Sequence, residues 1–184
     1  MIIGVTGPIC AGSDSFCKIL EKNGFKFLSY SDILREEARM RGIELTRKNL
    51  QDLGDQMRNK EGLGVLSRKI MERISVDDSD YVVGNIRNPG EVHELRKRKD
   101  FVLVMVDAPF ETRFQRVSDR DRESDPRTFD EFKKVEERDL GVNQKNYGQQ
   151  HGAVFEMADF VIINDSSLED FERNVQKLLE DVKC

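Results

Sequence analysis

Residues 1–20 read MIIGVTGPICAGSDSFCKIL, and this stretch decides the fold. The run 1–6 is short, apolar and rich in β-branched side chains, which predicts a buried strand that ends at Gly7. Apolar side chains then recur at helical spacing, so we expect a helix over 13–20, capped by the polar side chains at 13–15. A strand, a glycine turn and a helix in this order form a cradle whose backbone N–H groups converge on an anion.

The spacing of Gly7 and Gly12 matches the phosphate-binding P-loop pattern, but the next two residues depart from it. The pattern has Lys and then Ser or Thr there, because the ammonium follows the β- and γ-phosphates and the hydroxyl binds magnesium. This chain has Ser13 and Asp14 instead. The backbone cradle is kept while its fixed cation is lost, and the stretch alone fits a nucleotide site and a non-binding α/β domain equally well.

Length and composition describe one folded domain over 1–184, with 38% hydrophobic and 35% charged residues. The net charge of -5 argues against nucleic acid as the main partner. We expect a cytoplasmic protein without membrane association, because the N-terminus lacks signal-peptide features and no apolar run approaches the ~20 residues of a span. The three cysteines fit a reducing setting. Cys10 is interpreted as a small loop residue, with a reactive thiol as the alternative.

Strand and helix patterns alternate along the whole chain. This alternation predicts a three-layer α/β fold with a mostly parallel five-stranded sheet. We expect the helices over about 31–74, with Thr46–Lys60 and Glu61–Ile74 as two of them, to form a mobile subdomain that covers a site, and residues 113–140 to form a small lid. The family resemblance described below implies that this subdomain binds an acceptor. The stretch 142–152 is polar and is expected to be flexible. The four strands after the first are expected at 25–29, 81–83, 101–106 and 160–163.

Several polar residues follow the expected strands. Ligands in parallel sheets bind at the carboxyl ends of the strands, and this position favours a nucleotide site. Ser31 or Asp32 is expected to cap a helix, and Arg35 lies one turn further on, where an arginine fork suits a phosphate. The alternative is that Asp32 only caps the helix and Arg35 is solvated. The other candidates at strand ends are Arg87, Asn164, Asp165 and Ser166.

The segment 113–127 places five arginines among acidic residues. One interpretation is a self-neutralising surface, and the other is a lid whose arginines close on a transferring phosphoryl group. The histidines, His93 and His151, stand apart in the sequence and are expected at the surface.

With these residues assembled, nearly all of the chain resembles the P-loop nucleoside monophosphate kinases and their relatives, the dephospho-coenzyme A kinases, phage-type deoxynucleoside monophosphate kinases and archaeal adenylate-kinase-like proteins. The resemblance rests on four segments: SYSDILREEARMRG (29–42), YVVGNIRNPGEV (81–92), the lid-like RFQRVSDRDRESDP (113–126) and ADFVIINDSS (158–167). It implies ATP and Mg²⁺ as cofactors of an active enzyme, and a small-molecule nucleotide as its partner.

The resemblance also implies roles for individual residues. Those implied to act in catalysis are Asp32, Arg87, Arg113 and Arg116. Those implied to hold the acceptor are Asp32, Arg35, Arg87, Arg122 and Arg138, with Arg120 a further lid candidate. Those implied to hold the donor nucleotide are Gly7, Ala11, Gly12, Ser13, Asp14, Ser15, Asn164, Asp165 and Ser166, with Asp14 as a substitute magnesium ligand.

Two departures from the family pattern affect the donor phosphates and the metal. Ser13 replaces the lysine, and Gly84 followed by Asn85 replaces the acidic residue that ends the third strand. We therefore expect a kinase-derived nucleotide-binding protein with impaired or unusual catalysis. An active nucleoside monophosphate kinase and a non-catalytic scaffold remain alternatives. The scaffold would bind a protein partner, such as a deoxycytidylate deaminase. That deaminase would be a separate protein, because this chain has no deaminase zinc motif.

Overall fold

The computed structural model describes residues 1–75, 79–120 and 126–183. The strands form one parallel sheet in the order β2-β3-β1-β4-β5, which confirms the expected five-stranded α/β fold. Within the described ranges, no helix combines the length and apolar character needed to cross a bilayer. The elements in chain order are β1 (Ile2–Thr6), α1 (Ser13–Lys22), β2 (Lys26–Ser29), α2 (Tyr30–Met40), α3 (Arg47–Glu61), α4 (Val65–Met71), β3 (Tyr81–Gly84), α5 (Pro89–Leu95), β4 (Phe101–Asp107), α6 (Phe110–Arg120), α7 (Phe129–Leu140), α8 (His151–Phe155), β5 (Phe160–Ile163) and α9 (Leu168–Lys183).

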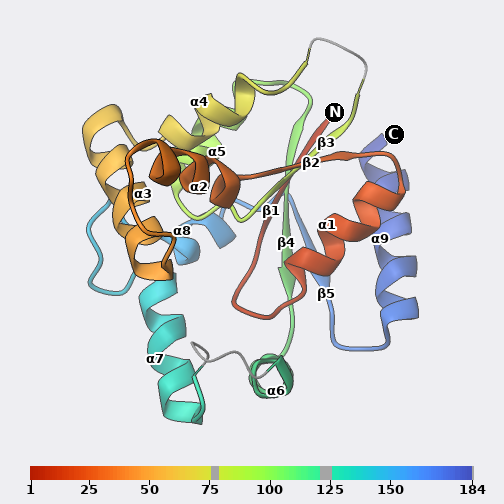
Figure 1. Cartoon of the computed structure of the whole chain (residues 1–184). Helices are drawn as coiled ribbons and strands as arrows, with labels where there is room; N and C mark the ends of the chain where they lie inside the picture. Colours follow the sequence, from red (N-terminus) through yellow and green to blue (C-terminus); the bar gives the residue numbers. More distant parts are fainter. Residues whose placement is uncertain (76–78, 121–125, 184) are drawn as a thin grey trace.

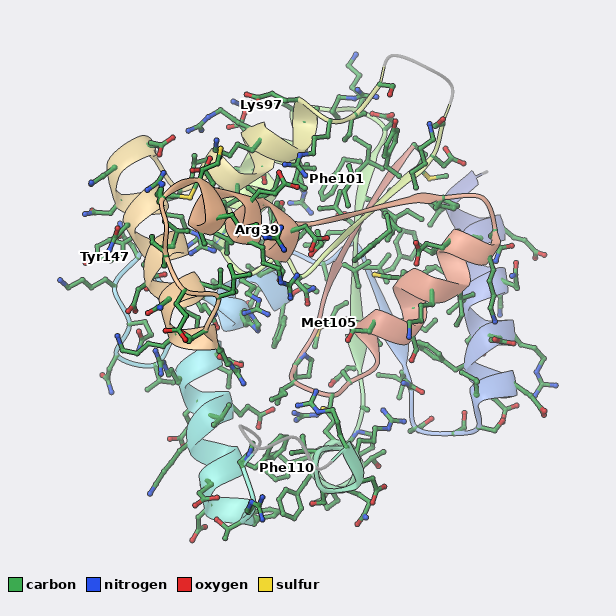
Figure 2. The ribbon with its side chains drawn as sticks, viewed as in Figure 1. Arg39, Lys97, Phe101, Met105, Phe110 and Tyr147 are labelled. Carbon is green, nitrogen blue, oxygen red and sulfur yellow. The ribbon has the colours of Figure 1, made fainter. Side chains whose placement is uncertain are left out.

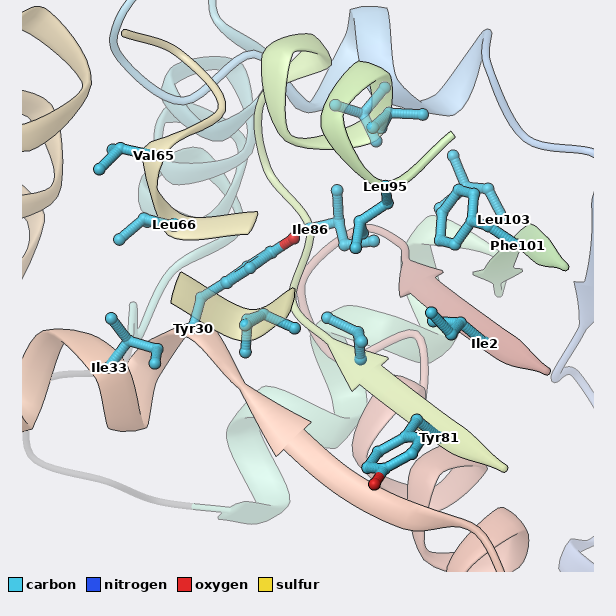
Figure 3. Close-up of a cluster of buried hydrophobic side chains, with 14 of the residues drawn as sticks. Ile2, Tyr30, Ile33, Val65, Leu66, Tyr81, Ile86, Leu95, Phe101 and Leu103 are labelled. Atoms are coloured by element: carbon cyan, nitrogen blue, oxygen red, sulfur yellow. The ribbon is translucent and has the colours of Figure 1, made fainter. Parts of the chain in front are cut away.

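Helices cover both faces of the sheet (Figure 1). Helices α1 and α9 lie on one face, while α2, α3, α4, α5 and α8 lie on the other. Each face has its own apolar core, because side chains alternate between the two sides of every strand. Figure 3 shows the core on the side of α2 and α4, where the Tyr30 ring extends from α2 toward Ile86 and Ile33 and Leu66 belong to the same cluster.

Two helices begin at residues other than the expected caps. Gly12 is the N-cap of α1 and makes no side-chain capping bond, so the polar side chains at 13–15 do not cap it. Ser29 rather than Ser31 or Asp32 caps α2, and its hydroxyl accepts a hydrogen bond from Ser31 N at 3.1 Å. Strand β2 therefore leads directly into α2, because a residue in extended conformation at the strand end also serves as the cap.

The stretch 142–152, which was expected to be flexible, contacts the segment after β3 through several hydrogen bonds. Asn88 Nδ2 donates to the carbonyls of Asn146 (2.8 Å) and Gly148 (3.0 Å), and Gln150 N donates to Arg87 O (2.8 Å). The short helix α8 follows directly. A polar stretch can be ordered when a buried amide elsewhere in the chain binds its backbone, and the local composition does not reveal that partner.

Helices α6 and α7 lie at the same end of the sheet as the β1–α1 loop (Figure 1), where the lid was expected. Phe110 and Phe114 of α6 contact Phe129 and Phe132 of α7, with ring centroids 4.7–5.6 Å apart. Figure 2 shows Phe110 at the α6 side of this contact. The aromatic contact joins the two helices into one unit beside the loop.

Candidate functional site

A cavity of about 670 Å³ lies at the carboxyl ends of β1, β2 and β3. Its first wall is the whole β1–α1 loop, residues 7–15, and its second wall comes from α2, α3 and the segment after β3. The volume suits a small organic ligand, and parallel sheets bind ligands at this end. We call the loop side the donor side and the opposite wall the acceptor side.

The loop on the donor side has the backbone conformation of an anion cradle. Gly12 has φ 111°, and Cys10 has φ 59°, so both lie in the left-handed region. A Cβ at Gly12 would lie 2.1 Å from Asn164 Nδ2, and a Cβ at Gly7 would lie 2.2 Å from Val106 O. Only glycine fits at either position. The N-terminus of α1, which has no side-chain cap, follows Gly12 and borders the cavity.

Two side chains from distant segments hold this loop in place. Asn164 is 8% exposed, and its Nδ2 donates to Ala11 O at 2.8 Å. Arg116 of α6 donates to Ala11 O (3.2 Å), to Cys10 O (3.3 Å) and to Asn164 O (2.9 Å). Arg116 also lines the cavity, whereas Asn164 is outside the cavity wall. The nucleotide contacts predicted for both residues stay predictions. The two residues that follow Asn164 in the sequence, Asp165 and Ser166, are exposed and do not line the cavity.

The structure has room for the missing P-loop side chain at Ser13 but not at Gly84. Ser13 is half-buried and lines the cavity, so a longer side chain there has space to follow a ligand. At Gly84 a Cβ would lie 2.8 Å from the Phe27 ring and 3.5 Å from Cys17 Sγ. The place that an acidic side chain would take at the end of β3 is thus filled by an aromatic ring. Asn85, which follows, has φ 65° and lines the cavity.

No cluster of three or more His, Cys, Asp or Glu side chains able to hold a metal occurs in the part of the chain that the structure describes. Asp14 is exposed on the first turn of α1 and lines the cavity beside Ser15. Magnesium commonly takes one or two carboxylates and completes its octahedron with water and ligand phosphates. Asp14 fits that limited part, and its role as a magnesium ligand stays a prediction.

Arginines line the acceptor side. Arg35 lies in the cavity wall, and its Nη1 donates to the exposed Asp32 at 2.8 Å, while Asp32 itself is outside the wall. Arg87, from the segment after β3, and Arg47, from the first turn of α3, also line the cavity. Together with the loop they give the cavity a cation-rich wall opposite the cradle, which suits a phosphate or another anion.

A hydrogen-bonded network positions Arg87. In the amide orientation that satisfies both of its ends, Gln149 accepts from Arg87 Nη1 (2.9 Å) and from Gln51 Nε2 (3.2 Å), and donates to Asp139 Oδ1 (2.8 Å). Burial lowers the pKa of Arg87, and the Asp139 carboxylate opposes that shift. Burial likewise raises the pKa of Asp139, against the positive charge of Arg87. The two charges are coupled through the amide of Gln149.

A second buried pair lies beneath this wall. Glu91 of α5 is fully buried, and its Oε1 accepts from Arg58 Nε (2.9 Å) and lies 2.8 Å from Arg58 Nη2. Its Oε2 accepts from the backbone N–H groups of Arg87 (2.8 Å) and Asn88 (3.1 Å). One carboxylate therefore fixes both Arg58 and the chain that carries Arg87. Arg58 also reaches Asp55 Oδ1 at 3.2 Å.

His151 was expected at the surface, and this expectation is wrong. The side chain is 7% exposed and lines the cavity, and within 1–75, 79–120 and 126–183 neither ring nitrogen has a hydrogen-bond partner. A buried polar atom without a partner costs roughly 1–3 kcal/mol, which is why such atoms are rare. The ring is buried because His151 begins the short helix α8, which packs against other elements. The sequence of α8 has no helical periodicity that would predict it.

Acid is expected to destabilise the protein through His151. Burial lowers its pKa to about 3, and the charges of Arg87 and Arg58 lower it as well, whereas an unfolded histidine titrates near pH ~6.5. The unfolded chain binds the extra proton between those two pKa values, so stability falls as the pH falls from about 6.5 toward 3. Urea unfolding should show about 2 kcal/mol of this loss between pH 7.5 and pH 5, and His151→Phe should lack it. Equal pH dependence in the two proteins would contradict the assignment.

The remaining lid arginines differ in their position relative to the cavity. Arg113 is 6% exposed, donates from Nε to Ala108 O (2.9 Å), pairs with Glu136 and lies over the Phe110 and Phe132 rings. The structure thus holds Arg113 in the contact between α6 and α7 rather than at the cavity. Arg120 lines the cavity, and Arg138 is exposed outside it. Arg122 lies outside the described residues.

The two described cysteines are expected to differ in reactivity. Burial, together with the charges of Asp14 and Glu21, raises the pKa of Cys17 to about 12. At pH 8 its thiolate fraction is therefore about 10⁻⁴. Cys10 is only half-buried in the loop. Iodoacetamide should alkylate Cys10 well before Cys17, as peptide mass mapping with a urea-unfolded control can show, and faster labelling of Cys17 would contradict this.

Sequence reasoning missed several cavity residues. Arg47 left a signal, because Arg47 and Lys48 place basic side chains in the first turn of α3, where the helix dipole disfavours them. Gln149 and His151 left none, since they lie in a stretch whose composition is that of a loop. Arg58 was indistinguishable in the sequence from the many exposed basic residues of the helical subdomain.

Comparisons with known proteins agree with this geometry. A family model described as an AAA domain matches residues 3–141. A UPF0200 protein of Thermococcus kodakarensis is 32% identical over 188 residues, which cover 99% of this chain and 98% of that protein. A UPF0200 protein of Hyperthermus butylicus is 35% identical over 180 residues, which cover 97% of this chain and 93% of that protein.

Solved structures show the same architecture. Shikimate kinase from Bacteroides thetaiotaomicron has a TM-score of 0.62 at 14% identity, covering 100% of this chain and 99% of its own. Dephospho-CoA kinase from Campylobacter jejuni has a TM-score of 0.54 at 17% identity, covering 98% of this chain and 96% of its own. At these identities the likeness shows the fold alone, and that fold is the P-loop kinase-like nucleotide-binding fold.

Proposed function

Because the chain belongs to the UPF0200 family and carries an AAA-type P-loop domain, we propose that it binds a nucleoside phosphate in the cavity beside the β1–α1 loop. The ligand is a small-molecule nucleotide, with ATP as the donor-side candidate and a monophosphate-bearing acceptor on the arginine side. The observation that carries the proposal is the pairing of an intact backbone cradle with a cation-rich wall across about 670 Å³.

We further propose that catalysis is impaired or takes an unusual route. In phosphoryl transfer the protein supplies mainly positioning and charge stabilisation, so loss of the loop cation lowers the rate by several powers of ten unless another cation replaces it. Arg116 and Arg120 both line the cavity and are the lid candidates for that replacement, whereas Arg113 is bound to Glu136 of α7 outside the cavity wall. The ancestral activity in this proposal is a nucleoside monophosphate kinase or dephospho-coenzyme A kinase type of transfer.

Phosphoryl transfer can be measured as ADP formation from ATP and magnesium with a panel of nucleoside monophosphates and dephospho-coenzyme A. The wild type is expected to stay near background, and Ser13→Lys is expected to raise the rate with at least one acceptor. Ser118→Lys adds the same charge at an exposed site of α6 outside the cavity wall and serves as the matched control. Robust turnover by the wild type would contradict impaired catalysis and favour an active kinase.

A further inference from the structure

We propose that His151 is a ligand-binding residue of the acceptor side, where its neutral imidazole donates a hydrogen bond to the phosphate monoester held by Arg87. This inference rests on the proposed function, because it needs a phosphorylated ligand in this part of the cavity. It assigns a contact to a side chain that the P-loop pattern does not include.

The first observation is the state of the ring. His151 lines the cavity and is 7% exposed, and no described residue forms a hydrogen bond with its Nδ1 or Nε2. The ring lies against Phe155, with 5.8 Å between the ring centroids. A histidine that only fills an apolar core usually bonds at least one nitrogen to a neighbouring backbone group. A neutral ring keeps one N–H to donate, and a ligand in the cavity supplies the missing acceptor.

The second observation is the charge that surrounds the ring. Arg87 from the segment after β3 and Arg58 from α3 both act electrostatically on His151. Arg58 is already paired with the buried Glu91 and with Asp55, and Arg87 is bridged to Asp139 through Gln149. The imidazole therefore lies in the positive potential of two guanidinium groups, each of which already has its own carboxylate partner or bridge. An anion is the group that satisfies the ring N–H and the local positive potential together.

The chain offers a clean spectroscopic test, since it contains two histidines and His93 is exposed on α5. Proton–carbon NMR of the imidazole Cε1–H groups would give one signal per residue, with His93 as the internal reference. The probes are inorganic phosphate and the four ribonucleoside 5′-monophosphates at pH 7.5. We expect phosphate and at least one monophosphate to shift the His151 signal while the His93 signal stays in place.

Calorimetry on variants separates a contact from a packing role. His151→Phe keeps an aromatic ring without a donor and should weaken monophosphate binding about 10-fold or more. His151→Gln restores an N–H donor and should bind within about 3-fold of the wild type. His93→Gln should match the wild type, and thermal unfolding of each variant shows that it is folded.

The possible outcomes are distinguishable. If a monophosphate binds but His151→Phe binds it equally well and the His151 signal does not move, the inference is overturned and the proposed function stands. If the His151 signal moves with a monophosphate but never with phosphate, contact with the anion is overturned. If none of the probes binds the wild type, the proposed acceptor site fails and the inference fails with it.

Discussion

Replacing Glu91 with alanine is expected to lower the free energy of unfolding by roughly 3–5 kcal/mol. The carboxylate is fully buried and accepts bonds from Arg58 and from the backbone N–H groups of Arg87 and Asn88. Its removal leaves a buried guanidinium without this partner and two backbone donors unsatisfied. Each of these losses costs more than an ordinary surface substitution, because the groups cannot reach water without opening the helical subdomain.

Urea unfolding of Glu91→Ala beside Glu94→Ala tests this expectation. Glu94 lies on the same helix, but its partners Lys97 and Arg68 are solvent-exposed, so its replacement should cost less than about 1 kcal/mol. A loss of stability that is equal in the two variants would show that the buried pair does not stabilise the fold beyond a surface pair.

Replacing Gly12 with alanine is expected to disable the loop, with a loss of roughly 2–4 kcal/mol in stability and more than about 10-fold in ATP affinity. The residue has φ 111°, where a Cβ is strained, and that Cβ would lie 2.1 Å from Asn164 Nδ2. The new methyl group would displace the Asn164 amide from Ala11 O, which it bonds at 2.8 Å. The loop would lose its conformation and one of its two supports.

Gly24 provides the matched control, since it has φ 90° and nothing within 4 Å of an added Cβ. Gly24→Ala therefore reports the backbone strain alone, about 1–2 kcal/mol, with ATP affinity unchanged. The difference between the two variants isolates the contact with Asn164. Equal ATP affinity in Gly12→Ala and the wild type would mean that the loop does not form the ligand site.

The sequence predicts the fold well because the fold depends on patterns that are local. The apolar strands β1 and β4, the glycine loop and the alternation of strands with helices are each visible in short windows, and together they leave few topologies for a parallel sheet. The donor-side wall follows from the same windows, since Gly7 and Gly12 carry it.

The acceptor side depends on contacts between segments far apart in the sequence. Asn88 orders 146–148, Glu91 holds Arg58, and Gln149 bridges Arg87 to Asp139. Each pair joins residues whose own surroundings look like ordinary polar surface. Arg113 and Arg116 share one helix face, but Arg113 pairs with Glu136 outside the cavity wall, whereas Arg116 binds the loop carbonyls and lines the cavity. A single sequence records neither set of partners.

The most direct test of whether the cradle binds a nucleotide is calorimetric titration with ATP. The wild type and Ser13→Lys are each titrated with and without magnesium. We predict weak ATP binding by the wild type that magnesium changes little, and clearly tighter binding by Ser13→Lys. This pattern would show an intact cradle that lacks its cation. Strongly magnesium-dependent binding by the wild type would show that Asp14 or another carboxylate restores the metal site. Absence of binding by both proteins would contradict the nucleotide-binding function itself.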